Sequence, residues 1–467
     1  MRVCLSLGSA ILTYDVMMIR RSLISFALLY ATVTGHALAQ STPSVFSHEV
    51  LPLIQEKFEP LLERETGLSL ESWGALMAGS DHGEVVIPYD PDGSLLVRLA
   101  TQLSSEDPLS MHAANVSKED LATVRSWIER GAPNDNGDIA FSDASNLLYA
   151  CIQGAAQLAI IDMDVNLVIR TIDLQELGFT ADSRPHHVAV EPDGSAFYVS
   201  LIGDDVVLKF NRENELVDQI AFERPGMLVV SPTDHQLFVG RSMKAVNPPQ
   251  RIGIVERNNM DLEELDVFFP RPHALAIDPT GTYVYVGSLA ENRMATVDHA
   301  SESPELQSIE GETHTLVQFA VSPDGQTMVV GGQLTGEFFF FDTSDPARPT
   351  LVESIKVGMA PWHPVFSPDG NMVWFGNKMG NRATVVDVEN REVVGTIEGL
   401  SEPHGAAISP DGRTVYISNN NLNGAFNGRY MWKDEYLPGA IAVIDSESRE
   451  ITRMLEVGPN PTGLGTR

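Results

Sequence analysis

Hydrophobic and polar residues follow one short pattern along most of the chain. An apolar strand leads into a Ser-Pro-Asp-Gly turn and a second apolar strand leaves it, as in residues 362–377. Proline presets the backbone at the first corner, aspartate bonds its own backbone, and glycine accepts the positive φ that closes the reversal. The pattern therefore predicts a series of β-hairpins with this turn, or a variant of it, at each tip.

The turn recurs at a nearly constant period. Copies lie at 191–194, 231–234, 278–281, 322–325, 367–370 and 409–412, after a decayed copy at 142–146. A repeat of about 40–47 residues is typical of a β-propeller with one four-stranded blade per copy. We predict a mainly β fold with a seven-bladed propeller over residues 136–467. Residues 457–465 repeat the lead-in to an inner strand without a blade after it, and we expect them to pair into blade 1 and close the ring.

Residues 44–133 have helical spacing instead. Apolar residues recur every three or four positions from Phe46 to Phe58, which indicates an amphipathic helix. Ser117 and Asp120 form a capping box that begins a helix ending before Pro133. We predict a small α-helical domain ahead of the propeller.

Residues 1–39 have the pattern of an export signal. Arg20 and Arg21 precede an apolar segment, and Ala37-Leu38-Ala39 forms a cleavage site. A start at Met17 or Met18 gives this signal an ordinary length of about 22 residues. The apolar segment is too short for a membrane span, so we expect a periplasmic or extracellular protein. Cleavage leaves Cys151 as the one cysteine, which excludes an intrachain disulfide.

The charge balance is strongly acidic. The chain has 63 Asp and Glu residues against 31 Lys and Arg residues, a net charge of −32. Such a field repels phosphate backbones, so we expect no nucleic-acid partner. We expect a monomer.

Two resemblances follow from these motifs. Residues 197–200, 284–287 and 415–418 have the Tyr-Val-type strand that resembles YVTN-repeat propellers, a family that includes binding modules, lactonase-like enzymes and metal-dependent oxidoreductases. Residues 50–54, 86–96 and 116–133 resemble the small cytochrome c domain of planctomycete-type secreted proteins.

The second resemblance fails at the haem. The family's Cys-x-x-Cys-His falls on residues 58–62, where Phe58, Leu61 and Leu62 are apolar. Met111 survives at the axial-ligand position as a relic. Without thioether cysteines and a proximal histidine, covalent haem cannot be held, and we expect a haem-free domain.

Histidines gather at one position of the repeat. Counting back eight residues from the turn glycine gives His186, His273 and His404, and His363 and His314 lie within a few residues of the same register. Because the entries to the inner strands lie around the channel mouth, these imidazoles could bind Cu or Zn. The other interpretation is that each ring bonds a neighbouring blade. His186 and His187 point to opposite sides of their strand and cannot share a metal.

A long loop in blade 7 is the second candidate. It carries Arg429, Tyr430, Trp432 and Tyr436 on the same face as Trp362. Aromatic residues of this kind are enriched at binding sites, and the alternative is a lid folded onto its own blade. The sequence has no nucleophile, phosphate-loop or metalloprotease motif, and Cys151 on a predicted strand fits the core better than catalysis.

The sequence thus favours an exported propeller that binds a small ligand or a protein partner through its channel-mouth face, with no cofactor. The alternative is a Cu- or Zn-dependent oxidoreductase or a lactonase-like hydrolase that uses the same histidines.

Overall fold

The computed structural model describes residues 46–246, 250–433 and 437–467, which belong to one compact unit. The export signal predicted at 1–39 and the candidate Tyr436 lie outside the described residues. Within the described ranges, no helix is long and apolar enough to cross a membrane.

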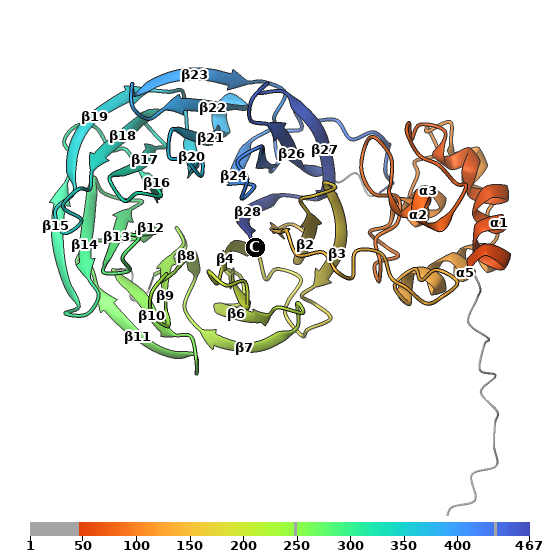
Figure 1. Ribbon diagram of the computed structural model, residues 1–467, viewed down its shortest axis with the longest axis horizontal. Coiled ribbons are helices and arrows are strands. Elements are labelled where there is room, and N and C mark those ends of the chain that lie inside the picture. Colours follow the sequence, from red (N-terminus) through yellow and green to blue (C-terminus); the bar gives the residue numbers. More distant parts are fainter. Residues whose placement is uncertain (1–45, 247–249, 434–436) are drawn as a thin grey trace, which may run out of the picture. The chain divides into compact units, whose positions relative to one another are not determined.

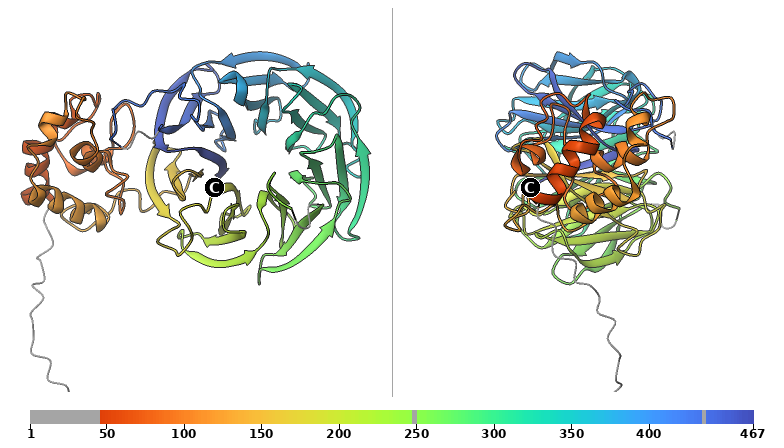
Figure 2. Two further views of the ribbon diagram at one scale, coloured as in Figure 1. Left: turned by 180° about the vertical axis from the view of Figure 1, so that it is seen from behind. Right: turned by 90° about the vertical axis from the view of Figure 1, so that its right-hand side faces the viewer.

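The described residues form seven four-stranded sheets around a central axis, a seven-bladed β-propeller (Figures 1 and 2). Neighbouring strands in each blade are antiparallel, and the first strand named for each blade lies nearest the axis (Figure 1). Blade 1 has β28 (Pro461–Thr466), β1 (Leu147–Ile152), β2 (Gln157–Asp162) and β3 (Leu167–Asp173). Blade 2 has β4 (Pro185–Val190), β5 (Ala196–Leu201), β6 (Val206–Asn211) and β7 (Leu216–Ala221). Blade 3 has β8 (Pro225–Val230), β9 (Gln236–Arg241), β10 (Arg251–Glu256) and β11 (Asp261–Asp266).

The remaining blades follow in chain order. Blade 4 has β12 (Pro272–Ile277), β13 (Tyr283–Ser288), β14 (Arg293–Asp298) and β15 (Ser303–Ser308). Blade 5 has β16 (Leu316–Val321), β17 (Thr327–Gly332), β18 (Glu337–Asp342) and β19 (Thr350–Lys356). Blade 6 has β20 (Pro361–Phe366), β21 (Met372–Asn377), β22 (Arg382–Asp387) and β23 (Glu392–Ile397). Blade 7 has β24 (Pro403–Ile408), β25 (Thr414–Asn419), β26 (Gly439–Asp445) and β27 (Ile451–Gly458).

The last strand closes the ring. β28 is the inner strand of blade 1 and pairs antiparallel with β1, with Tyr149 opposite Gly465. The predicted pairing of the tail into blade 1 is therefore confirmed. Closure removes the free inner edge that β1 would otherwise present to other chains.

The repeated turn is built as its residues predict. In the copy at 322–325, the Ser322 hydroxyl donates to the Asp324 carboxylate at 2.6 Å and accepts from the Thr327 N–H at 3.0 Å. Gly325 has a φ of +73°. Glycine is needed there because a side chain disfavours this conformation. The hydrogen bond from Ser322 lowers the pKa of Asp324.

Tyrosines from the repeat fill the spaces between blades. Tyr149, Tyr198, Tyr285 and Tyr416 are all completely buried. The hydroxyl of Tyr416 in blade 7 donates to Asn166 Oδ1 in blade 1 at 2.6 Å, and that of Tyr285 in blade 4 donates to Pro346 O in blade 5 at 2.9 Å. The rings of Tyr285 and Tyr416 thus contribute apolar area and a hydrogen bond to the contact between adjacent blades. The Tyr198 hydroxyl instead donates to Glu191 within blade 2, and the Tyr149 hydroxyl has no partner among the described residues. Cys151 is also fully buried on β1, and burial raises the pKa of its thiol.

Residues 46–133 form a helical module. Its helical segments are η1 (Phe46–Val50), α1 (Leu51–Leu53), η2 (Ile54–Phe58), η3 (Glu59–Leu62), α2 (Trp73–Met77), α3 (Leu95–Thr101), α4 (Ser110–Ala113) and α5 (Lys118–Glu129). The predicted capping box is present at α5, where Asp120 N–H donates to Ser117 Oγ and Ser117 N–H donates to Asp120 Oδ2. Phe58, Leu61 and Leu62 lie in the apolar core of the module, whereas Met111 is 73% exposed.

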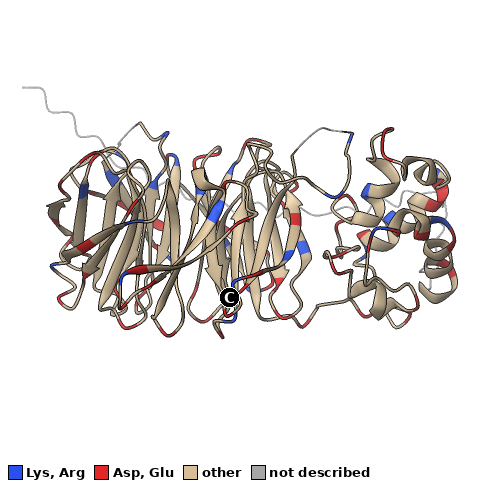
Figure 3. Cartoon of the chain, turned by 90° about the horizontal axis from the view of Figure 1, so that it is seen from above, with Lys and Arg blue, Asp and Glu red and all other residues tan. Residues whose placement is uncertain are grey.

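Acidic residues occur throughout the described chain. Figure 3 marks them in red on both the helical module and the propeller. The excess of 63 acidic over 31 basic residues therefore belongs to the surface as a whole, and a region without carboxylates stands out against it.

Candidate functional site

The histidines of the repeat meet at one end of the propeller axis. Each inner strand begins after a residue with positive φ, such as Arg184 (+53°), Arg271 (+53°) and Glu402 (+48°). In blades 2, 4 and 7 the next two residues are proline and histidine. This corner turns the chain into the inner strand, so the first side chains of several blades face the same space.

These side chains line a pocket of about 240 Å³, named here the axial pocket. It lies at the starts of the inner strands and the ends of the second strands. Its lining includes His186, His273, His363, His404 and Trp362. The predicted channel-mouth residues of blades 2, 4, 6 and 7 are thus brought together.

The imidazole rings lie close to one another. The ring centroid of His186 is 5.8 Å from that of His273 and 5.5 Å from that of His404. The ring of His363 is 4.6 Å from that of His404. His187 points to the other side of the strand from His186. Its ring centroid lies 6.2 Å from that of His363, so His187 is also a neighbour of the cluster.

Two of the rings bond the neighbouring blade. His273 Nδ1–H donates to Arg241 O of blade 3 at 2.8 Å, and His187 Nδ1 accepts from the Leu228 N–H of blade 3 at 3.3 Å. The blade 3 residue at the repeat position is Gly226, where an added Cβ would lie 2.7 Å from His273 Nδ1. Glycine at 226 therefore makes room for the ring of His273.

Three buried nitrogens at the pocket are left without partners. His363 Nε2, His404 Nδ1 and Trp362 Nε1 have no hydrogen-bond partner among the described residues. His363 and His404 are only 4% and 5% exposed. An unmet buried donor or acceptor costs about 1–3 kcal/mol, so these groups favour a ligand that supplies the missing bonds.

Burial keeps the imidazoles neutral. It lowers the pKa of His187 to about 3 and that of His273 to about 4. It also lowers the pKa of His186, His363 and His404 well below the ordinary value, and the positive charge of Lys378 adds to this effect. At neutral pH each ring therefore offers one N–H donor and one nitrogen acceptor.

Lys378 was not singled out by sequence reasoning. It lies in the short helical turn η4 (Lys378–Gly380) after β21, where its Nζ is 4.6 Å from the centroid of the Trp362 ring and donates to Asn420 Oδ1. The loops after the second strands reach the channel mouth, which is the signal that could have identified it. Sequence reasoning missed Lys378 because it does not occupy the repeat position that the histidines share.

The candidate metal ligands are only partly gathered. His314 lies outside the axial pocket. Its Nδ1 lies 3.0 Å from Thr335 Oγ1, and its Nε2 lies 3.2 Å from Glu310 O. Across residues 46–246, 250–433 and 437–467, no group of three or more His, Cys, Asp or Glu side chains is arranged to hold a metal ion.

The candidate residues of the blade 7 loop contact the helical module instead. The long loop, described over residues 420–433 and 437–438, brings Arg429 Nη1 to Glu65 at 2.9 and 2.8 Å, and the Tyr430 hydroxyl also donates to Glu65. Tyr430 and Trp432 are 5% and 7% exposed within the core of the module. These side chains are therefore separate from the axial pocket that includes Trp362.

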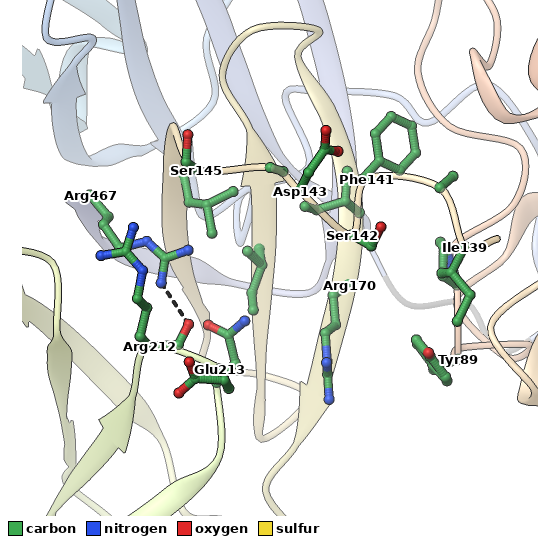
Figure 4. Close-up of a pocket in the computed structure, with 17 residues that line it drawn as sticks. Tyr89, Ile139, Phe141, Ser142, Asp143, Ser145, Arg170, Arg212, Glu213 and Arg467 are labelled. Atoms are coloured by element: carbon green, nitrogen blue, oxygen red, sulfur yellow. Dashed lines mark hydrogen bonds between the residues drawn. The ribbon is translucent and has the colours of Figure 1, made fainter.

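A second hollow of about 460 Å³ is lined by residues of blades 1 and 2 together with Pro88 and Tyr89 of the helical module (Figure 4). Arg170, Arg212 and Arg467 line it together with the acidic Asp143 and Glu213. Arg467 Nη1 donates to Arg212 O at 2.8 Å. Charged side chains of both signs, three arginines and two carboxylates, line this hollow, and none of the predicted site residues is present.

The fold and the site together define a seven-bladed β-propeller with a histidine-lined axial pocket. No family model matches the chain. A region of 102 residues is 29% identical to antigen Lp49 of Leptospira interrogans, and this match spans 22% of each protein.

Solved structures show the same architecture. Hydrazine synthase of Kuenenia stuttgartiensis has a TM-score of 0.52 at 16% identity, covering 66% of this chain and 94% of that chain. A protein of unknown function from Desulfotomaculum acetoxidans has a TM-score of 0.54 at 14% identity, covering 69% and 99%. The β-propeller domain of Cps50 (Swd1) from Myceliophteria thermophila has a TM-score of 0.50 at 12% identity, covering 61% and 91%. At these identities the similarity shows the fold alone.

Proposed function

We propose that this chain is an exported binding protein whose axial pocket holds a small molecule. The observation that carries the proposal is the set of unpartnered buried nitrogens on His363, His404 and Trp362. In most small-molecule sites, a few donors and acceptors in a mainly apolar pocket orient the ligand. Export rests on the signal-like pattern of residues 1–39, and the acidic charge supports the absence of a nucleic-acid partner.

The helical module serves as a structural accessory in this proposal. Its resemblance to a cytochrome c domain, and that of the propeller to the YVTN-repeat family, rest on the sequence motifs. The burial of Phe58, Leu61 and Leu62 supports a haem-free module, because these apolar side chains pack where the resemblance would place the haem attachment. The long loop then holds the module to blade 7.

A screen of small neutral, cationic and anionic fragments by ligand-observed NMR tests the proposal on the mature chain. We expect saturable binding that weakens at least tenfold in His404→Leu, which removes both ring nitrogens at similar volume. His82→Leu is the matched control, because His82 lies in the helical module. Binding that is equal in His404→Leu and the wild type, or no binding at all, would overturn the proposal.

A metal-dependent enzyme is the second candidate. Its support is the spacing of the His186 ring, 5.8 and 5.5 Å from two other imidazoles, since neutral imidazoles suit Cu and Zn. Elemental analysis of the mature protein decides the point. One Cu or Zn per chain, lost in the triple variant His186→Ala, His273→Ala, His404→Ala, would replace the binding proposal with the enzyme.

A further inference from the structure

The lining of the axial pocket has a different balance of charge from the chain as a whole. The chain has twice as many acidic as basic residues, 63 against 31, yet the described residues that line this pocket include Arg184 and Lys244 and no Asp or Glu. Arg184 pairs through Nε with Asp182 at 2.6 Å, and Lys244 is exposed at the rim. The wall of the pocket therefore carries positive charge within an acidic surface.

A third cation lies directly behind this wall. The Nζ of half-buried Lys378 is over the ring of Trp362, which itself lines the pocket. The acidic residue that acts on Lys378 is Glu402, whose carboxylate accepts from the Asn423 N–H at 2.7 Å. The field of Lys378 also helps to keep His186, His363 and His404 uncharged. Positive charge thus comes from the lysine rather than from the rings.

The unpartnered nitrogens at the pocket also favour a ligand that carries negative charge. The Trp362 indole N–H is a donor only, and it has no acceptor among the described residues. The neutral rings of His363 and His404 can present N–H at their unpartnered nitrogens by choice of tautomer. A ligand that satisfies the indole must bring an acceptor, and acceptors that carry negative charge form the stronger bonds.

The rest of the pocket is apolar. Ile202, Met243, Leu289 and Val317 contribute to its lining. These side chains favour a hydrophobic group on the ligand, and they offer nothing to a hydrated inorganic ion. The pocket volume of about 240 Å³ suits a small molecule.

We propose that the ligand of the axial pocket is a small organic carboxylate with an apolar body. Its carboxylate accepts from the Trp362 and histidine N–H groups in the field of Lys378, and its body packs on the aliphatic wall. This inference rests on the proposed binding function and names the class of ligand.

A matched pair of probes tests the charge. Phenylacetate and phenylacetamide have the same shape, and the amide has no negative charge. We expect the full mature chain to bind phenylacetate at least tenfold more tightly at pH 7 in low salt, as measured by ligand-observed NMR titration. Lys378→Met removes this preference. Lys356→Met is the control, because Lys356 is a 68% exposed lysine paired with Glu337 in blade 5.

Other outcomes separate this inference from the proposed function. If phenylacetamide or the cationic 2-phenylethylamine binds as tightly as phenylacetate, and His404→Leu abolishes that binding, the pocket is a binding site but not for carboxylates. Displacement of phenylacetate by equal concentrations of inorganic phosphate would overturn the requirement for an apolar body. If none of these probes binds while fragments of the wider screen do, the carboxylate inference fails alone. If nothing binds at all, both fail.

Discussion

At the scale of the residue, the axial cluster depends on imidazoles that the fold holds uncharged. His187 is 8% exposed and its Nδ1 accepts a backbone hydrogen bond from Leu228. Protonation at Nδ1 would break that bond and place a charge in the interior, and the native state resists it. Burial lowers the pKa of His187 from 6.5 to about 3.

The pH dependence of stability follows from this residue. Below pH 6.5 His187 is protonated in the unfolded chain, whereas in the native protein it stays neutral down to about pH 3. The contribution to stability is therefore complete above pH 6.5 and is lost as the pH falls. We expect the free energy of unfolding of His187→Gln to fall less steeply between pH 6 and 4, by about 1.4 kcal/mol per pH unit. Urea titrations at several pH values measure the slope, and parallel profiles for the two proteins would contradict the assignment.

At the scale of the element, the long loop of blade 7 is a strap between two parts of the unit. Arg429 also contacts Glu456 at 3.4 Å, so one guanidinium joins Glu65 of the module to β27 of the propeller. The Glu65 side chain is fully buried. Loss of Arg429 would leave this buried carboxylate bonded to the hydroxyls of Tyr430 and Ser80 but without its cation.

Arg429→Met tests the strap. We expect it to lower the free energy of unfolding by about 3 kcal/mol and to increase proteolysis within residues 420–438. Addition of Glu65→Gln should recover part of the loss, because it removes the stranded charge. Arg391→Met is the comparison, since Arg391 and Glu353 are an exposed pair at 3.3 Å worth less than about 1 kcal/mol. Equal losses at the two arginines would show that the strap is no stronger than a surface pair.

At the scale of the whole molecule, close backbone contacts lock the ring where β28 passes β4. A Cβ added at Gly463 would lie 2.3 Å from His186 O and 2.8 Å from His187 Cα. Both are main-chain atoms and cannot rotate away. The contact that closes the propeller is therefore also the contact that fixes two histidines of the axial cluster.

Gly463→Ala should destabilise the protein by about 1–3 kcal/mol, the cost of overpacking a tight contact. Gly74→Ala is the control, because a Cβ there meets nothing within 4 Å, and alanine in α2 should stabilise by about 0.5–1 kcal/mol. Urea unfolding measures both, and hydrogen exchange at β1 locates the effect. A Gly463→Ala protein as stable as the wild type would show that closure tolerates a wider separation of β28 and β4.

The sequence predicts those features of the fold that depend on residues close together in the chain. The Ser-Pro-Asp-Gly turns fix the hairpins, and the period of the turns fixes the blades, so the histidine register at 186, 273 and 404 could be read in advance. The position of Tyr430 and Trp432 could not, because it depends on Glu65, a residue 365 positions from Tyr430. The hydrogen bond from Lys378 to Asn420 of blade 7 and the room that Gly226 makes for His273 were missed for the same reason: each is a contact between different blades.

Ring closure also sets the order in which the chain can become native. The Thr462 hydroxyl donates to Cys151 O across 311 residues, so the first blade is translated long before its innermost strand exists. Before β28 is synthesised, the backbone edge of β1 that pairs with it in the native protein has no partner strand. Such distant pairings form slowly. We therefore expect the pairing of β28 with β1 to be a late step in folding.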